Sequence, residues 1–470
     1  MYPPRSAKYK QKKKQKQQRQ TKVWSIINLT LIVAVCLVGL YIYYSSNDAT
    51  TADSGPAASD SGNGTESSQS GTSGDHGTNS GTGSVDGQGS SNQSSSPDET
   101  GSNPAGASDR TSNSGSQDGS ANPDPSGRGS SVAAGTNPVS QNSEQGQPAG
   151  NTSAGSPDDL VLHFGGDTLF SGKAETKLEN AGYDYPFQYV NSLFTQDDLT
   201  VLNLETPVTY GGKGASDKQY VFKSSPKALE AMAEAGVDAV NLANNHTLDQ
   251  GEEGLLDTLD HLKNAGIASV GAGVNADQAY APQYFERKGI KIALFGFSRV
   301  LPKADWAAGA SKPGIAGVYD PTRAYAAIKA ARQKADLILV ITHWGKERVQ
   351  QFDDTQTALA HGLIDAGADL VIGGHPHVLQ GLEQYKGKWI AYSTGNFIFT
   401  RSTNEKTWET AVFEARCSKS GSCGMKLIPY TAELAQPVPM QAEDAAKLLQ
   451  EIQSLSPGVT VDKAGNVSAG

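Results

Sequence analysis

Three mainly apolar runs in the second half of the chain each end in a segment that carries histidine. Residues 237–242 precede Asn244-Asn245-His246, residues 335–342 precede His343-Trp344-Gly345, and residues 368–372 precede Gly374-His375-Pro376-His377. Runs of this kind are typical of strands buried on both faces of a sheet. Because the carboxyl ends of parallel strands meet at one sheet edge, we expect the three histidine segments to lie together.

Helical and strand patterns alternate from residue 158 onward, which indicates α/β layering. A helix is expected at 226–235, with Ser225 as its N-cap and Pro226 in its first turn. Hairpin strands are expected after residue 407, and the last residues are expected to be frayed. Further helices are expected at 254–264, 321–333, 355–366 and 442–454, and strands at 160–164, 200–204, 290–297, 337–342, 370–372 and 389–392. Residues 158–470 are numerous enough for one large domain.

The sequence before residue 158 divides into three segments. Residues 1–22 are basic and polar, and 23–44 form an uncharged apolar run long enough to span a bilayer as a helix. Residues 45–157 are rich in serine and glycine with few large apolar side chains, which predicts a disordered linker. The basic flank predicts a cytoplasmic N-terminus and an extracellular C-terminal domain. A cleaved signal peptide is the alternative, although the run is long and no A-x-A site follows it.

Net charge and cysteine placement limit the partners and the compartment. The formal net charge of −10 argues against a nucleic-acid partner. Cys417 and Cys423 flank a short turn between two strand-like runs, and we expect them to form a disulfide in an oxidising exterior. A zinc site at these cysteines would need further ligands nearby, and the sequence offers none.

Carboxylates follow two earlier strand-like runs. Asp167 comes after Gly165-Gly166, and Glu205 comes after Asn203-Leu204. Carboxylate and imidazole ligands together suit Mn, Zn or Fe. Paired ions of this kind can hold both oxygens of a phosphoryl transfer and generate hydroxide near neutral pH. The strand ends therefore predict a metal site of the phosphoesterase type.

The order of these motifs resembles that of the CapA family of poly-γ-glutamate capsule proteins, within the calcineurin-like metallophosphoesterase superfamily. Between about residues 160 and 401 the motifs run Gly-Asp, Asn-x-Glu, Asn-Asn-His, His-Trp-Gly, Gly-His-Pro-His and Gly-Asn-Phe. The resemblance implies a calcineurin-like fold, a layered α/β/β/α sandwich, here preceded by one transmembrane helix and a disordered linker. The anchor and linker also resemble those of the extracellular subunit of the poly-γ-glutamate synthase complex.

The resemblance implies roles for individual residues. His246 would be the substrate-facing general acid, and Glu205 would bridge two ions. The implied metal ligands are Asp167, Glu205, Asn245, His343, His375 and His377. The superfamily's first motif is Asp-x-His, whereas this chain has Asp167-Thr168-Leu169. One histidine is missing, so the site is expected to hold one or two divalent transition metal ions.

Three functions remain open. The first is a membrane-anchored extracellular component of poly-γ-glutamate synthesis or export, which works with membrane-embedded synthase subunits on an anionic polymer. The second is a secreted metal-dependent phosphoesterase with a phosphorylated substrate. The third is a non-catalytic, polymer-binding scaffold. The missing histidine after Asp167 favours the third over the second, and the intact Asn245-His246 pair favours the second.

Other polar residues have plainer interpretations. Asp249 is interpreted as part of a capping box for the following helix. His163 is expected to be a core or sheet-facing histidine, and His261 and His361 are expected to be ordinary helix residues. The lysines after Glu205 either form a basic lip for a polyanion or belong to a solvated loop; they are Lys213, Lys218, Lys223 and Lys227.

Overall fold

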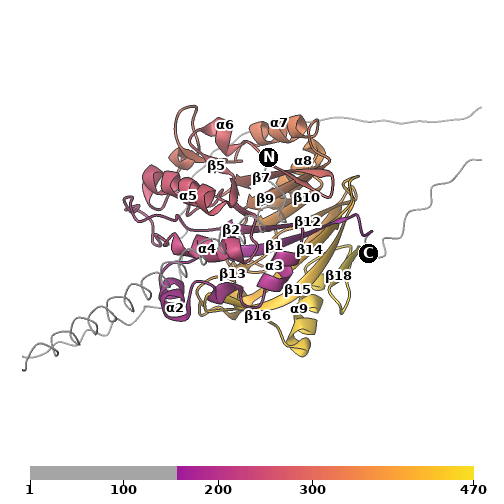
Figure 1. The fold of residues 1–470 in the computed structure, drawn as a ribbon. Helices are drawn as coiled ribbons and strands as arrows, with labels where there is room; N and C mark the ends of the chain where they lie inside the picture. Colours follow the sequence, from indigo (N-terminus) through magenta and orange to yellow (C-terminus); the bar gives the residue numbers. More distant parts are fainter. Residues whose placement is uncertain (1–155) are drawn as a thin grey trace, which may run out of the picture. The chain divides into compact units, whose positions relative to one another are not determined.

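Residues 156–470 fold around two mixed β-sheets, and these are the residues that the computed structural model describes (Figure 1). The α/β class predicted from the sequence is confirmed. The basic tail at 1–22, the transmembrane run at 23–44 and almost all of the linker at 45–157 lie outside the described residues. Within 156–470, no helix has both the length and the apolar character that a membrane span requires.

The larger sheet has the strand order β17-β18-β15-β14-β1-β2-β3-β4, with β13 beside β1 and β16 beside β15. Its first four strands along the chain pair in parallel, and β14 joins them in the antiparallel direction. The strands are β1 (Leu160–Thr168), β2 (Leu199–Leu204), β3 (Ala239–Asn241), β4 (Ala268–Val270), β13 (Asn396–Ile398), β14 (Glu409–Cys417), β15 (Cys423–Glu433), β16 (Gln436–Pro439), β17 (Val459–Val461) and β18 (Asn466–Ala469).

The smaller sheet has the strand order β11-β12-β10-β9-β7-β6, and its central strands β12, β10, β9 and β7 are parallel. A short pair, β5 (Ala272–Gly273) and β8 (Gly314–Ile315), stands apart from both sheets. The strands of the smaller sheet are β6 (Gln283–Arg287), β7 (Ile290–Ser298), β9 (Leu337–His343), β10 (Leu370–Gly374), β11 (Leu382–Tyr385) and β12 (Lys388–Ala391).

Helices cover the outer faces of the two sheets, and the apolar side chains separate into three clusters accordingly. One cluster lies between the sheets and includes Phe164 and Leu339. A second joins the larger sheet to α2–α5, and a third joins the smaller sheet to α7 and α8. The helices are α2 (Lys173–Ala181), α3 (Asn191–Gln196), α4 (Lys227–Glu234), α5 (Gly251–Ala265), α6 (Ala276–Ala279), α7 (Thr322–Ala331), α8 (Asp354–Ala366) and α9 (Ala442–Ser454), with 3₁₀ turns at η2 (Tyr185–Phe187), η3 (Ala304–Trp306) and η4 (Glu405–Trp408).

Strand β9 shows why the sequence has unbroken apolar runs. Leu337, Leu339 and Ile341 point into the cluster between the sheets. Ile338 and Val340 alternate with them and pack under the helices of the third cluster. Because successive side chains of a strand point to opposite faces, a strand covered on both faces needs apolar residues at every position.

Two details of the sequence prediction are corrected. Helix α4 begins at Lys227 with Pro226 at its N-cap, one residue later than predicted, although Ser225 Oγ still accepts from the Lys227 amide at 3.4 Å. The C-terminal residues are not frayed, because β18 pairs with both β15 and β17. Val461 and Val467 are buried in the cluster between the sheets, and this burial holds the end of the chain in place.

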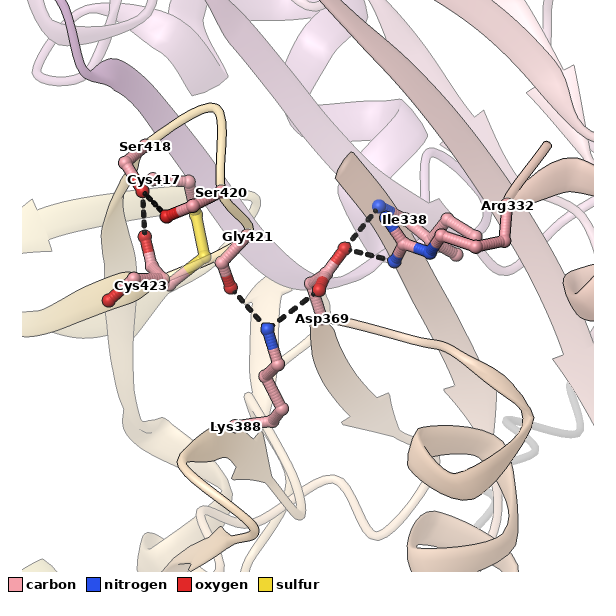
Figure 2. Close-up of a disulfide and its surroundings, with 10 residues drawn as sticks. Arg332, Ile338, Asp369, Lys388, Cys417, Ser418, Ser420, Gly421 and Cys423 are labelled. Atoms are coloured by element: carbon pink, nitrogen blue, oxygen red, sulfur yellow. Dashed lines mark hydrogen bonds and ion pairs between the residues drawn. A yellow bond between two sulfur atoms is a disulfide. The ribbon is translucent and has the colours of Figure 1, made fainter. Parts of the chain in front are cut away.

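The predicted disulfide between Cys417 and Cys423 is confirmed, and it closes the turn between β14 and β15 (Figure 2). This turn docks onto the smaller sheet, since Lys388 Nζ donates to Gly421 O (2.6 Å) and to Asp369 Oδ1 (2.7 Å). The other oxygen of Asp369 accepts from the Ile338 amide at 2.9 Å and pairs with Arg332. One buried carboxylate thus ties the disulfide turn to β9 and α7.

His163 on β1 is a buried core histidine, as expected, and it lies between two carboxylates. Its Nδ1 is 2.7 Å from Asp197 Oδ2, and its Nε2 is 3.4 Å from Glu414 Oε2 on β14. Burial disfavours the charged imidazole, but the two carboxylates outweigh it and raise the pKa of His163 above 6.5. The hydrogen bond from His163 lowers the pKa of Glu414 to about 2.

We expect His163→Gln to destabilise the protein more at about pH 5.5 than at about pH 8.5. A histidine whose pKa is raised by folding stabilises the fold fully below its unfolded pKa of 6.5, and this contribution is lost as pH rises through the folded pKa. The Glu414 contribution is present above 4.5 and is lost as pH falls toward about 2. Urea unfolding of both proteins at the two pH values measures the difference.

His361→Gln provides the matched control for this experiment. His361 on α8 also contacts a carboxylate, Glu383, at 2.7 Å, but both side chains are partly exposed. Pairs in contact with solvent contribute little to stability. A His163→Gln effect that is equal at both pH values would show that His163 is not charged in the folded protein.

Candidate metal centre

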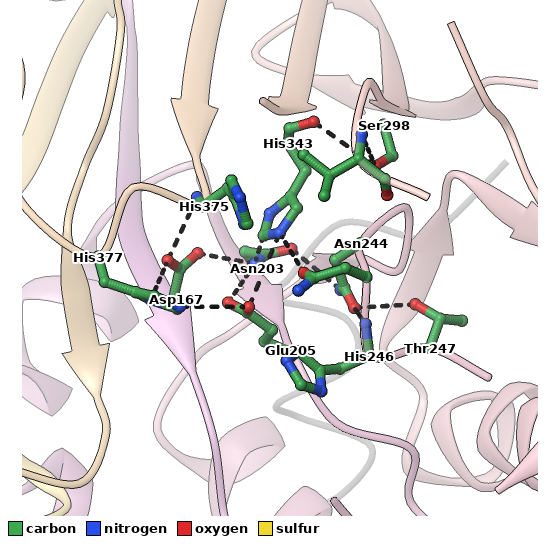
Figure 3. Close-up of polar contacts among 12 residues, drawn as sticks. Asp167, Asn203, Glu205, Asn244, His246, Thr247, Ser298, His343, His375 and His377 are labelled. Atoms are coloured by element: carbon green, nitrogen blue, oxygen red, sulfur yellow. Dashed lines mark hydrogen bonds and ion pairs between the residues drawn. The ribbon is translucent and has the colours of Figure 1, made fainter. Parts of the chain in front are cut away.

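The carboxyl ends of parallel strands from both sheets meet at one place, and the polar motifs lie there (Figure 3). The larger sheet contributes Asp167 near the end of β1 and Glu205 directly after β2. The smaller sheet contributes His343 as the last residue of β9 and His375 directly after β10. The His375 amide donates to Asp167 Oδ2 at 3.3 Å, so the two sheets are joined at the centre itself.

Two groups of potential ligand atoms share a single residue, Glu205. The first group is Glu205, His343 and His375; the second is Asp167, Glu205 and His377; within each group the ligand atoms lie within 4.8 Å of one another. Glu205 Oε1 is 3.7 Å from His343 Nε2 and 3.8 Å from His377 Nε2. One carboxylate oxygen therefore stands between a histidine of each group, which is the arrangement that a bridging ligand requires.

Asn245 lies beside the first group. Its Oδ1 lies 2.8 Å from His343 Nε2. Taken with the two groups, the structure brings together all the residues that the sequence suggested as ligands. Leu169, which stands where the resembled Asp-x-His motif has histidine, is buried and donates its amide to Ile398 O at 2.6 Å.

Two of the potential ligand atoms have no hydrogen-bond partner, which suits the binding of a cation. Among the described residues, Glu205 Oε1 and His375 Nδ1 are buried without a hydrogen-bond partner. Buried polar atoms are nearly always paired, so two orphaned ligand atoms in one cluster need an explanation. Burial and the charge of Asp167 raise the pKa of Glu205 well above its usual value, and the opposing charge of Lys218 does not offset them. A divalent ion between these atoms would satisfy them.

The protonation of the histidines is consistent with this assignment. Burial and the neighbouring His375 lower the pKa of His343 well below its usual value. Burial and His377 lower the pKa of His375 to about 3. Both imidazoles are therefore neutral at physiological pH, which is the form that binds metal ions. His377 differs, because burial lowers its pKa but the hydrogen bond to Asp167 and the nearby negative charges together raise it above its usual value.

The histidine segment after β10 has an unusual backbone. His375 and His377 have φ values of 97° and 57°, in a region that side chains other than glycine rarely adopt. Residues held in such conformations cost on the order of 1–3 kcal/mol each and are concentrated at functional sites. The strained backbone directs both imidazoles toward Asp167 and Glu205, which the alternation of an extended strand would not do.

His246 lies beside these groups and is held by a carboxylate. Its Nδ1 donates to Asp249 Oδ2 at 2.7 Å, and its ring stacks 4.3 Å from the ring of Phe222. Lys218 Nζ donates to Asp249 Oδ1 (2.5 Å) and to the carbonyl of Asn245. Burial and the charge of Lys218 lower the pKa of His246, against the opposing effect of Asp249.

The interpretation of Asp249 as a helix cap is wrong. Helix α5 begins at Gly251 with Gln250 at its N-cap, and no side chain caps it. Asp249 instead accepts from His246, from Lys218 and from the Phe222 amide at 2.7 Å. A turn after His246 points the carboxylate back toward the imidazole, three residues earlier, rather than forward to the helix.

Two asparagines of the sequence motifs contact the proposed ligand residues, although the sequence analysis gave them no role. Asn203 Nδ2 donates to Asp167 Oδ1 (2.8 Å) and to Glu205 Oε2 (3.3 Å), so it orients two carboxylates. Asn396 Oδ1 accepts from His377 Nδ1 at 2.9 Å. Both asparagines belong to motifs that had been recognised, Asn-x-Glu and Gly-Asn-Phe, so a signal for them was present.

Of the lysines after Glu205, Lys218 forms hydrogen bonds with residues of the centre. Lys218 is partly buried against Asp249 and lies 4.9 Å from the ring of Trp306. Lys213 is exposed, and Lys227 lies over the ring of Tyr183 at 5.9 Å. Of the four lysines, Lys218 is the one whose hydrogen bonds reach residues of the centre, and its charge is paired with Asp249.

Known proteins resemble this chain over the region that builds the centre. The model of the family described as "Bacterial capsule synthesis protein PGA_cap" matches residues 161–401. The PGA biosynthesis protein CapA of Bacillus subtilis (strain 168) is 33% identical over 64% of this chain and 79% of its own length. The capsule biosynthesis protein CapA of Bacillus anthracis is 31% identical over 60% of this chain and 69% of its own length.

A mycobacterial protein is also similar. The probable polyglutamine synthesis accessory protein MT0602 of Mycobacterium tuberculosis (strain CDC 1551 / Oshkosh) is 34% identical over 43% of this chain and 56% of its own length. The family match spans β1 through β13, so it contains every strand end that contributes to the centre.

Proposed function

The chain belongs to the bacterial capsule synthesis protein family PGA_cap, and from this membership we propose that it serves poly-γ-glutamate capsule synthesis through the carboxylate–histidine centre. The centre would use one or two divalent transition metal ions, Mn, Zn or Fe, held by Asp167, Glu205, Asn245, His343, His375 and His377. The observation that carries this proposal is the buried, unpaired Glu205 Oε1 between the two ligand groups.

The fold, the location and the partners of the protein form part of the same proposal. The α/β/β/α layering and the order of the motifs support a calcineurin-like metallophosphoesterase fold. The apolar run at 23–44 supports a membrane anchor that leaves the described domain outside the cell. The name of the mycobacterial relative, a synthesis accessory protein, supports work alongside membrane-embedded synthase subunits.

The roles of the protein groups follow from their contacts. Bound metal would supply Lewis acidity and a water of lowered pKa. Asp249 accepts from His246 Nδ1 and so leaves Nε2 as the atom that exchanges a proton with a leaving group. A positioned acid of this kind typically contributes on the order of 10²–10⁴-fold to a rate. Asn203 and Asn396 hold Asp167 and His377 in place.

A complementation experiment tests the proposed catalytic role. Cells lacking the gene are supplied with the wild-type gene, His246→Ala or the control His261→Ala, which changes a histidine of α5 outside the centre. We expect at least a tenfold loss of polymer per cell with His246→Ala, by the lower range for acid–base catalysis, and no loss with the control. Immunoblots establish equal protein levels.

The same strains separate an enzyme from a scaffold. Normal polymer yield with His246→Ala would contradict catalysis and would support the alternative of a non-catalytic, polymer-binding subunit. The buried Leu169 in place of the usual histidine is the observation that favours this alternative, because it deprives the second ligand group of one donor.

A further inference from the structure

Two arginines differ from the others in the described part of the chain. The others form ion pairs with a carboxylate; these are Arg287, Arg323, Arg332, Arg401 and Arg416. Arg299 and Arg348 have no carboxylate within ion-pairing distance among residues 156–470. The backbone amides of both arginines are hydrogen-bonded to the segments that carry the histidines of the centre.

Both arginines are anchored to the loops that carry the histidines. Arg299 directly follows β7, and its amide donates to His343 O at 2.8 Å. The Arg348 amide donates to Pro376 O at 2.7 Å, between the two histidines of the segment after β10. Because β9 lies between β7 and β10, Arg299 after β7 and Pro376 after β10 are two strand spacings apart, about 10 Å.

Stacking holds the side chain of Arg299, and a strained loop holds the backbone of Arg348. The Arg299 guanidinium stacks 3.8 Å from the ring centre of Tyr319, whose side chain is exposed. Stacking fixes the plane of a guanidinium and leaves its N–H edge free for a bidentate acceptor. Arg348 has a φ of 62°, so its loop is held in a strained conformation although the side chain is exposed.

We propose that Arg299 and Arg348 are specificity-determining residues, each of which binds a separate carboxylate of an anionic chain lying across the metal centre. The proposal rests on the proposed function and deepens it. A guanidinium binds a carboxylate through two parallel hydrogen bonds. Two such sites on opposite sides of His343 select an acceptor with repeated charges over a small ester with one charged group. They also offset the repulsion of a polyanion by an acidic protein.

Binding of γ-linked glutamate oligomers to the full-length protein tests the proposal. Labelled decamers and dimers are titrated at about 0.1 M salt against wild type, Arg299→Gln, Arg348→Gln and the double variant. We expect each single change to weaken decamer binding about fivefold, which corresponds to about 1 kcal/mol, the upper range for an exposed ion pair, and the double change to weaken it more than tenfold. The dimer should bind weakly to all four proteins.

Arg323→Gln is the matched control. Arg323 also lies over a tyrosine ring, that of Tyr280 at 4.9 Å, but it is paired with Asp277 and belongs to α7. Its loss should leave decamer binding unchanged. Decamer binding that is the same in the double variant and the wild type, or absent in the wild type, would overturn the proposal, as would equal weakening by the control.

Two further comparisons test the chemical class of the ligand and distinguish this proposal from the proposed catalytic function. If polyphosphate displaces the decamer with the same dependence on both arginines and binds more tightly, the chain that is recognised is a phosphate polymer and the carboxylate assignment fails. If the arginine variants lose decamer binding while His246→Ala cells make normal polymer, the catalytic proposal fails and anion recognition stands. The reverse result rejects only the role of the arginines.

Discussion

Replacing Glu205 with glutamine is expected to remove most of the metal from the protein. Glu205 is the residue shared by both ligand groups, and its Oε1 has no other partner among the described residues. Glutamine has the same shape but no charge, and its amide nitrogen cannot act as a ligand. Because loss of residues that merely support ligands already costs about 10–100-fold in metal affinity, we expect a loss of at least 100-fold here. Metal analysis of the purified full-length protein after dialysis measures it.

Thermal unfolding with and without a chelator makes the prediction sharper. Bound metal at 100–1,000 times its dissociation constant stabilises a protein by about 3–4 kcal/mol, so the wild type should lose that amount when chelated. The Glu205→Gln protein should be insensitive to the chelator. Without metal it should be at least as stable as the wild type, because it no longer buries a carboxylate whose pKa is strongly raised.

Glu383→Gln is the control for this substitution. Glu383 also faces a histidine, His361, at 2.7 Å, but it lies outside both ligand groups. It should keep its metal and its response to the chelator. If Glu205→Gln retained a full complement of metal, Glu205 would not be a ligand and the bridging arrangement would be rejected.

Replacing Asp249 with asparagine is expected to reduce polymer production in complemented cells at least tenfold. Asp249 fixes which nitrogen of His246 carries the proton, and asparagine can present an N–H where the carboxylate accepted one. Loss of the corresponding carboxylate in a well-studied histidine–aspartate pair lowers turnover by about 10⁴-fold while the geometry is kept. Polymer per cell, at equal protein level, measures the effect.

A helix cap and an orienting carboxylate predict different results for this substitution. Loss of a cap would cost about 1 kcal/mol of stability and leave polymer production intact. Asp257→Asn provides the control. Asp257 on α5 accepts a hydrogen bond from the Thr209 hydroxyl and lies outside the ligand groups of the centre. If the Asp249→Asn protein unfolded at a lower temperature but supported normal polymer yield, Asp249 would have a structural role and would not orient His246.

Much of the centre could be predicted because its residues lie in short motifs at strand ends. An apolar run followed by a polar motif fixes both the strand and the position at which the motif emerges, so Asp167, Glu205, His343 and His375 could be placed at one edge. The same local logic found the disulfide, since Cys417 and Cys423 flank a turn that pairs them directly. The departure from the resembled Asp-x-His motif was also visible in Asp167-Thr168-Leu169.

Other features depended on contacts between distant segments. The local sequence pattern predicted that Asp249 caps a helix. In the structure its carboxylate is turned away from the helix because it accepts hydrogen bonds from His246 and Lys218. The end of the chain has the composition of a frayed tail, yet β18 finds an edge of β15 with which to pair. Hydrogen-bond partners that arrive from elsewhere in the fold override local preference in both cases.

The sequence by itself determined the α/β class, the strand ends and the chemical types of the ligand residues, because each depends on neighbours within a few positions. Only the tertiary structure decided that Glu205 stands between two histidine groups and that Arg299 and Arg348 have no carboxylate partner within residues 156–470. Those facts depend on how two sheets face each other, which brings Asp167 to the amide of His375 across 208 positions of sequence. Burial between the sheets then leaves the Glu205 oxygen without a partner, and the arrangement of its neighbours makes it a place for a cation.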